Sequence, residues 1–214
     1  MLLYYLWEFI VDIWSFIVDS IDDRRRWKGK ERQRIGFYLS LDADELQNLP
    51  DIELFATPYE QLTRKHFIHR VTALAELERF NSVQQVFWAL DTYEQACYSG
   101  GILAFLTSKY RYVTPILLSA METVGAVAHM ELLRDFMERN RIEPNELSDF
   151  DLSGLKPKDR NARLAELKER YGVSAFDEEY RALEPIEGYM IPYIRENAEM
   201  LLAEVPKEER RKTR

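Results

Sequence analysis

The chain contains few residues whose types and spacing would support catalysis. Cys97 is the single cysteine, and the histidines are His66, His69 and His129. A cysteine beside a histidine can act as a nucleophile, and two histidines three residues apart on a helix can share a metal ion. Neither set is complete, because nothing joins His66 and His69 as a third ligand, and a lone cysteine is more often a buried structural residue. We therefore predict no metal site and no cofactor.

Two pairs of carboxylates, Asp91 with Glu94 and Glu178 with Glu179, lie close together in the sequence. Paired carboxyl groups perform acid–base chemistry when a histidine, a metal ion or a difference in environment separates their roles. The sequence offers neither pair such a partner, and the phosphate-binding, dinucleotide, nucleophile-elbow, zinc and EF-hand motifs are all missing. We predict that the chain is not an enzyme. A hydrolase with a pocket formed by Glu94, Cys97 and His129 is the enzymatic alternative.

A glycine pair, Gly100-Gly101, follows an apolar helical pattern that ends at Ser99. Backbone N–H groups in such a turn can hold an anion, but a helix C-terminus carries partial negative charge and repels anions. We therefore interpret the pair as a helix C-cap and a close-packing turn, without a bound anion.

The distribution of charge is more informative than its total of −8. Residues 35–203 contain 17 Lys and Arg against 28 Asp and Glu, whereas the two flanks are basic overall. A domain this acidic repels nucleic acid and attracts a basic partner over about a Debye length, roughly 8 Å. Solubility alone is the alternative explanation for such a composition.

Residues 1–19 form an apolar stretch whose polar positions, Glu8, Asp12, Ser15 and Asp19, have helical spacing. The stretch lacks the positive start and small cleavage-site residues of a secretory signal, and three carboxylates disfavour a membrane span. Three alternatives remain: packing on the rest of the protein, homodimer formation, and peripheral membrane contact assisted by the basic run Arg24 to Arg34.

Few glycines and prolines, with frequent helical spacing, predict an all-α protein. We expect an apolar helix and basic linker over residues 1–34, one acidic multi-helix domain over 35–204, and a charged tail over 205–214. Residues 35–62 look irregular apart from a short helix over 41–46 with an Asp cap. Further helices are expected over residues 58–80, 82–99, 114–139, 162–171, 177–183 and 186–203, and residues 131–139 either continue or renew the helix that begins at residue 114.

The helix that begins at Thr114-Pro115 has a regular apolar face. Gly125 is expected to permit close helix contact there. The side chains predicted to point inward are those of Leu117, Leu118, Met121, Val124, Val127 and Ala128.

The stretch from Tyr93 to Gly125 resembles a bacterial family of all-helical domains named after a DNA-mimic protein. In this family, a glutamate precedes a Gly-Gly pair, an apolar and an aromatic residue follow, and a later helix ends in Ile/Val-Gly-Ala. The chain carries this order over residues 72–202, with Ser99 and Ile102 where the family usually has Asn and Phe. The positions that carry this order are Glu94, Gly100, Gly101, Phe105, Val124-Gly125-Ala126, Asp177, Tyr180 and Tyr193 to Asn197, with Ile102 as the apolar residue after the glycine pair.

This resemblance implies a helical scaffold whose acidic surface imitates the phosphates of duplex DNA and occupies a basic DNA-binding protein. The expected contacts are acids in loops or at helix starts, namely Glu143, Glu146, Asp149, Asp151, Asp177, Glu178 and Glu179. We expect such a protein to be cytoplasmic, with direct nucleic-acid binding excluded by its charge. The alternative function is a membrane-associated or self-associating scaffold that uses residues 1–19.

Overall fold

The computed structural model describes residues 29–206, which contain helices and no strand, so the predicted all-α class is confirmed. The chain divides into two compact units, Met1–Leu41 and Asp42–Arg214. In the first unit, residues 29–40 are helical, although residues 35–40 were expected to be irregular. The apolar stretch 1–19, with its proposed dimer or membrane contact, lies outside the described residues, as does the tail from 207.

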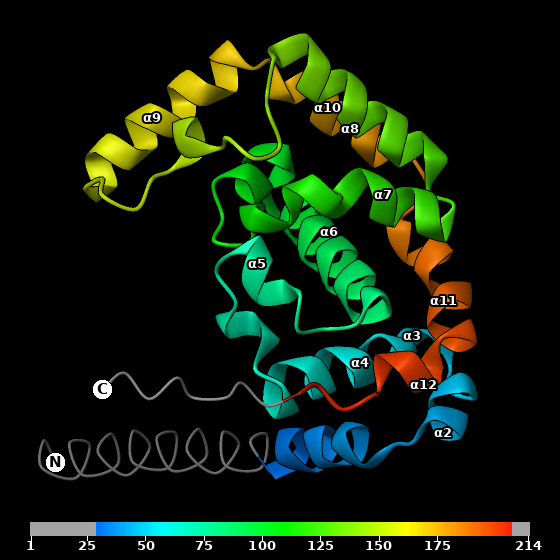
Figure 1. Cartoon of the computed structure of the whole chain (residues 1–214). Coiled ribbons are helices and arrows are strands. Elements are labelled where there is room, and N and C mark those ends of the chain that lie inside the picture. Colours follow the sequence, from blue (N-terminus) through cyan, green and yellow to red (C-terminus); the bar gives the residue numbers. More distant parts are fainter. Residues whose placement is uncertain (1–28, 207–214) are drawn as a thin grey trace, which may run out of the picture. The chain divides into compact units, whose positions relative to one another are not determined.

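The second unit begins with three short helices, α2 (Ala43–Gln47), α3 (Asp51–Leu54) and α4 (Ala56–Glu60) (Figure 1). The predicted Asp cap is present, because the Asp42 carboxylate accepts a hydrogen bond from the Glu45 amide at 2.9 Å. The Glu45 carboxylate accepts one from the Asp42 amide in return.

The prediction of a single helix over residues 58–80 was wrong. The chain passes from α4 through a π-helical turn, Gln61–Lys65, and a 3-10 turn, Ile68–Arg70, to α5 (Leu74–Leu77). Phe67 lies between the two turns with a left-handed φ of 55°, which a continuous helix does not allow. This break leaves Phe67 44% exposed and puts Ile68 in the core instead.

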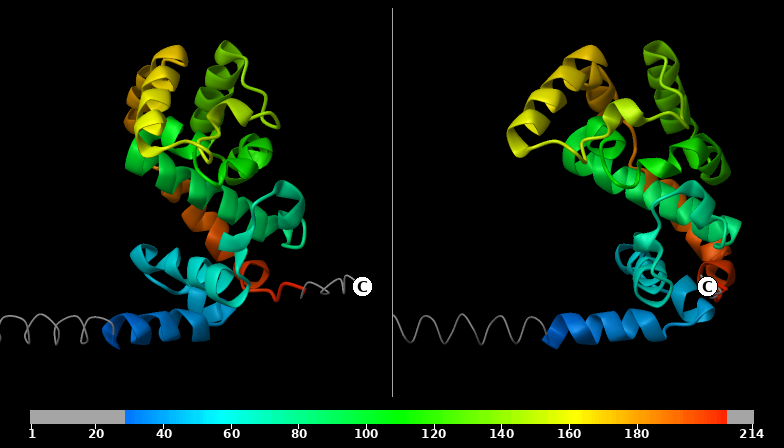
Figure 2. Two further views of the ribbon diagram at one scale, coloured as in Figure 1. Left: turned by 90° about the vertical axis from the view of Figure 1, so that its left-hand side faces the viewer. Right: turned by 60° about the vertical axis from the view of Figure 1, so that its left-hand side comes forward.

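Helix α6 (Ser82–Leu106) is the longest element of the second unit. It lies between the short helices α2 to α4 and the helices of residues 157–182 (Figure 2). Asn81 caps it as predicted, accepting from the Gln84 amide at 2.9 Å. The two side chains also bind α12 (Ala198–Leu201) and the residues after it. Asn81 donates to the Met200 carbonyl at 2.8 Å, and Gln84 donates to the Ala203 carbonyl at 2.9 Å.

The stretch expected to be helical over residues 114–139, as one helix or with a renewed helix from residue 131, forms two helices, α7 (Thr114–Val124) and α8 (Val127–Asn140). Gly125 ends α7 with a left-handed φ of 81°, and a Cβ at this glycine would touch nothing within 4 Å. Its predicted role in close helix contact was therefore wrong; its role is that of a left-handed C-cap. Because the break changes the helical phase, Val127 and Ala128 are exposed rather than inward-pointing.

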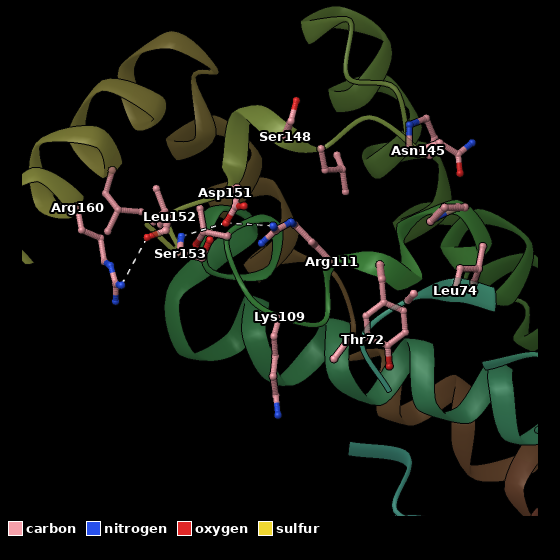
Figure 3. A pocket seen from close by; sticks show the side chains of 17 residues that line it. Thr72, Leu74, Lys109, Arg111, Asn145, Ser148, Asp151, Leu152, Ser153 and Arg160 are labelled. Carbon is pink, nitrogen blue, oxygen red and sulfur yellow. Dashed lines mark hydrogen bonds and ion pairs between the residues drawn. The ribbon is translucent and has the colours of Figure 1, made fainter. Parts of the chain in front are cut away.

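The C-terminal part of the unit contains α9 (Pro157–Arg170), α10 (Val173–Ala182) and α11 (Ile186–Glu196), followed by α12. The predicted acidic loop precedes α9 and has only one 3-10 turn, Ser148–Phe150. Together with residues 107–115 and 72–74, this loop borders an open pocket of ≈ 830 Å³ (Figure 3).

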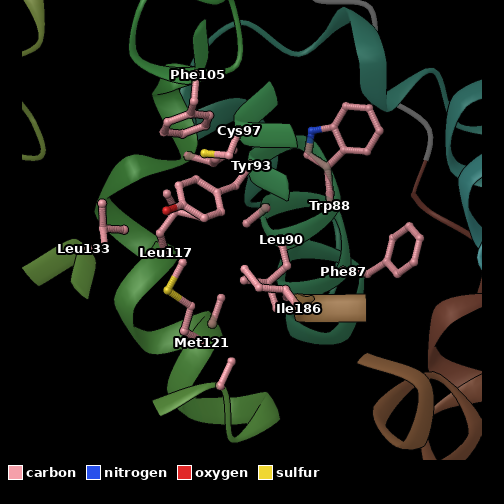
Figure 4. Packing of buried hydrophobic residues seen from close by; sticks show 14 of the residues in the cluster. Phe87, Trp88, Leu90, Tyr93, Cys97, Phe105, Leu117, Met121, Leu133 and Ile186 are labelled. Atoms are coloured by element: carbon pink, nitrogen blue, oxygen red, sulfur yellow. The ribbon is translucent and has the colours of Figure 1, made fainter. Parts of the chain in front are cut away.

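The core of the second unit forms around α6 (Figure 4). The Tyr93 ring, which is fully buried, meets the Phe105 ring edge-on at a centroid distance of 5.1 Å. Trp88 is also buried, and its indole N–H donates to the Tyr112 hydroxyl at 2.9 Å. Tyr93 and Phe105 lie on opposite sides of the glycine pair in the sequence, so their contact joins the two segments of α6.

Candidate interaction surfaces

The amide that follows the glycine pair binds a carboxylate, that of the protein's own Asp177. Gly101 has φ 75° and ψ −178°, a conformation open essentially to glycine alone. The turn ends the first segment of α6 and makes Ile102 the start of a second one. Its amide donates to Asp177 Oδ1 at 2.8 Å. The anion therefore meets a helix N-terminus rather than the C-terminus considered from the sequence.

Ser99 and Gly100 complete the break in α6. The Ser99 hydroxyl donates to the Gln95 carbonyl at 2.6 Å, within the last turn of the first segment. A Cβ at Gly100 would lie 2.8 Å from the Ala104 Cβ, so a larger residue would crowd the second segment. Close approach is therefore confirmed at the pair. The approaching element at Gly101 is α10, which carries Asp177.

Glu94 and Asp91 lie one turn apart on α6, and both are drawn into the interior. Glu94 Oε1 accepts from the Glu187 amide at 3.4 Å, at the first turn of α11. Burial, and then the nearby Glu187 carboxylate, raise the pKa of Glu94 to about 7. Burial also raises the pKa of Asp91 to about 7, while Gln95 donates to its carboxylate at 2.8 Å. Glu94 therefore joins α6 to α11, whereas Asp91 is bound within α6.

Cys97 and His129, the candidates for nucleophilic chemistry, are both buried. Burial raises the pKa of the Cys97 thiol well above its usual range, so the reactive thiolate is disfavoured. His129 Nε2 lies 2.7 Å from the Glu184 carbonyl oxygen, so this nitrogen carries the proton, and burial lowers the pKa of the imidazole. Within residues 29–206, no three His, Cys, Asp or Glu side chains are grouped closely enough to hold a metal ion.

Two acids of the loop before α9 are bound by arginines. Asp149 accepts from the Tyr171 hydroxyl at 3.0 Å and lies 3.2 Å from Arg170 Nη1. Asp151 lies 3.3 Å from Arg111 Nη2. These contacts neutralise part of the negative charge that the sequence places in this loop.

The other predicted contact residues are exposed. Glu143 and Glu146 lie in the loop, and Glu178 and Glu179 lie on α10. Asp177, Asp149 and Asp151 have internal partners, and the other four point to solvent from two elements.

Sequence reasoning missed a denser group of acids where α2 and α3 pack against α11 and α12, at the lower right of Figure 1. We call residues 42–54 and 194–200 the acidic corner. It contains seven carboxylates and a single basic residue, Arg195. Six of the carboxylates are exposed and Glu53 is half-buried. The carboxylates are those of Asp42, Asp44, Glu45, Asp51, Glu53, Glu196 and Glu199.

Arg195 holds the acidic corner together. Its guanidinium donates to the carbonyls of Gln47 and Leu49 and to Asp51 Oδ1, the last at 2.6 Å. The Arg195 guanidinium is therefore already bound to groups at the end of α2, in the following loop and at the start of α3. In the described part of the chain, Asp51 is the only carboxylate of the corner that forms an ion pair. The absence of Lys and Arg between residues 42 and 54 was the sequence signal for this surface.

The family comparison decides the relationship that the glycine motif suggested. The family model described as DMP19-like protein matches residues 78–197, which include α6, its glycine break, Asp177 and α11. The chain belongs to the DMP19-like protein family. This confirms the resemblance to the DNA-mimic family. Comparisons with curated proteins and with solved structures found no match. Between residues 29 and 206, no helix has the length and apolar character needed to cross a bilayer.

Proposed function

We propose that this DMP19-like chain is a non-enzymatic acidic interaction protein, a DNA mimic that occupies a basic DNA-binding protein in the cytoplasm. The observation that carries the proposal is the acidic corner, where seven carboxylates share one basic residue. Duplex DNA carries about one negative charge per 1.7 Å of axis, so a mimic needs closely spaced acids that cations of its own chain do not neutralise. The corner supplies such acids, and the loop before α9 does so less well.

Two exposed apolar side chains favour protein binding over a purely solvating role for the corner. Ile52 is 92% exposed between Asp51 and Glu53, and Met200 is 46% exposed beside Glu199. Protein interfaces combine apolar contacts with a polar rim, and these two side chains would supply the apolar contacts. The acids would attract a basic partner and set its orientation, and Ile52 and Met200 would be buried on contact.

The predicted residues Glu143, Glu146, Glu178 and Glu179 extend the proposed surface as exposed acids outside the corner. In this proposal they add long-range attraction, and the corner provides the direct contacts. Asp149, Asp151 and Asp177 contribute less, because each already has a hydrogen-bond or ion-pair partner.

The test is affinity capture by the immobilised full chain from cells that express it, at low salt, with elution by duplex DNA. The proposal expects a DNA-binding protein that DNA elutes and that binds less tightly as salt increases. The Asp44→Asn/Glu196→Gln/Glu199→Gln variant should lose most of this binding, because these side chains form no hydrogen bond or ion pair within the described residues.

A matched control, Glu143→Gln/Glu146→Gln/Glu178→Gln, changes the net charge by the same amount outside the corner. It should retain most of the binding. Equal losses in both variants would show a response to net charge rather than to the corner. If DNA elutes no captured protein, the DNA-mimic proposal is wrong.

A further inference from the structure

The pocket beside the loop before α9 is basic, on a protein that is acidic overall. Its lining includes Lys109, Arg111 and Arg160, with Asp151 as its single carboxylate. We call it the basic groove. Leucine, proline and tyrosine side chains supply the apolar part of the lining, including Leu74, Tyr112, Pro115, Leu147, Leu152 and Leu164.

The three cations are separated along the groove rather than gathered at one point (Figure 3). Lys109 and Arg111 come from the turn between α6 and α7, and Arg160 comes from the first turns of α9. Lys109 also lines a neighbouring pocket of ≈ 300 Å³, where Arg64 forms an ion pair with Glu60. This spacing suits an elongated ligand with several negative charges better than one small anion.

Arg111 already binds a carboxylate within the groove. Its Nη2 lies 3.3 Å from Asp151 Oδ1, and its Nη1 donates to the Ser108 carbonyl at 3.2 Å. Lys109 Nζ donates to the His69 carbonyl at 3.3 Å, and a guanidinium or ammonium group has further donors to offer. Asp151 thus occupies a position in which a carboxylate from another molecule would also be bound.

We propose that the basic groove binds an extended acidic and apolar peptide segment of a partner protein. Carboxylates of the peptide would meet Lys109, Arg111 and Arg160, while its apolar side chains would cover the leucine and proline surfaces between them. The groove volume lies within the usual range for ligand sites, about 300–1,000 Å³. This site has the opposite charge to the acidic corner, so the proposal does not depend on the function proposed above.

An acidic peptide fits this groove better than a nucleic acid does. The whole chain carries a net charge of −8, which repels a polyanion over about a Debye length. A short peptide with about four carboxylates is repelled less. Its aliphatic side chains also match the apolar lining, which offers nothing specific to phosphates or sugars.

The test is a fluorescence-anisotropy titration of the full chain with a labelled peptide of alternating Glu and Leu, about eight residues long, or roughly 26 Å when extended. The Lys109→Gln/Arg160→Gln variant should weaken binding about tenfold, as expected for the loss of two exposed charge contacts. Asp151→Asn should strengthen binding a few-fold, because it removes the internal competitor for Arg111. The matched control Arg134→Gln/Arg139→Gln alters two exposed cations of α8 outside the groove and should leave binding unchanged.

Two further probes separate the peptide from other ligands. The same peptide with Gln in place of Glu should bind at least tenfold more weakly, and an oligothymidine of similar length should bind more weakly than the acidic peptide. The proposal is overturned if the oligothymidine binds more tightly, or if Asp151→Asn and Lys109→Gln/Arg160→Gln leave the affinity for the peptide unchanged.

Discussion

The carboxylates of the second unit belong to two populations that differ in their partners. In the acidic corner, Asp44, Glu196 and Glu199 are exposed. Around the glycine break and the basic groove, Asp177 is bound by a backbone amide, Asp151 by an arginine, and Glu94 by the start of α11. The first population is available to a partner, and the second holds the fold together. The number of acids in the sequence therefore overstates the charge that the surface presents.

The difference has a structural origin in the way that α6 is built. At its N-terminal end, neutral side chains, Asn81 and Gln84, make the contacts to α12, so the nearby acids are not needed for packing. At the glycine break, a carboxylate makes the contact. Substitution of the bound carboxylates should therefore reduce the stability of the protein. Substitution of the exposed carboxylates should reduce partner binding without reducing stability.

The largest expected effect is that of Gly101→Ala. An alanine would be strained at φ 75° and ψ −178°, and its Cβ would overlap the Asp177 carboxylate. We expect the free energy of unfolding in urea to fall by about 3 kcal/mol or more. Gly154→Ala is the control, because its Cβ would meet nothing within 4 Å and its φ is not left-handed. Equal stabilities for the two variants would contradict the assigned role of Gly101.

Asp91 should make the stability of the protein depend on pH. A carboxyl whose pKa is raised to about 7 in the folded protein binds more protons there than in the unfolded chain. The contribution of Asp91 to the free energy of unfolding is therefore greatest below about pH 4. It falls by up to about 1.4 kcal/mol per pH unit as the pH rises through about 7.

Asp91→Asn keeps an acceptor for Gln95 and removes the titration, so its unfolding free energy should vary less between pH 4.5 and 7.5. The lowered pKa values of His66 and His129 act in the opposite direction, since stability from a neutral buried histidine increases with pH. The measurement is therefore the difference between the wild type and the variant at each pH. A difference that does not change with pH would exclude Asp91 as the cause.

Asp177→Ala should lower the free energy of unfolding by about 1–2 kcal/mol, because the Ile102 amide loses its acceptor. Asp177→Asn retains an acceptor oxygen and should recover most of this loss. Thermal and urea unfolding of both variants provide the measurement. If the two variants are equally destabilised, the negative charge matters more than the hydrogen bond.

The smallest expected effect on stability is in the acidic corner. Glu199→Gln should change the free energy of unfolding by less than about 0.5 kcal/mol, because the side chain is exposed and makes no hydrogen bond or ion pair within residues 29–206. It should still weaken capture of a basic partner. A clear loss of stability would place Glu199 with the structural carboxylates and remove the distinction between the two populations.

Local sequence patterns were sufficient to predict the all-α class, the Asp42 and Asn81 caps, the break of α6 at Gly100-Gly101, and the family. These features depend on residues within a few positions of one another, or on a motif order that can be read directly. Local rules also produced errors. The helix predicted over 58–80 assumed a continuous apolar face. The helical phase assigned to Val127 was extended through Gly125, which ends α7.

Which carboxylates are exposed and which are bound could not be predicted from local sequence, because it depends on the packing of distant helices. Asp177 and Ile102 are 75 residues apart in the sequence, and Arg195 and Asp51 are 144 apart. Whether a carboxylate finds a cation or an amide depends on how distant helices pack, which local spacing does not specify. For the same reason, the acidic corner and the basic groove emerge only when α2 and α3 meet α11 and α12, and when the loop before α9 meets the turn after α6.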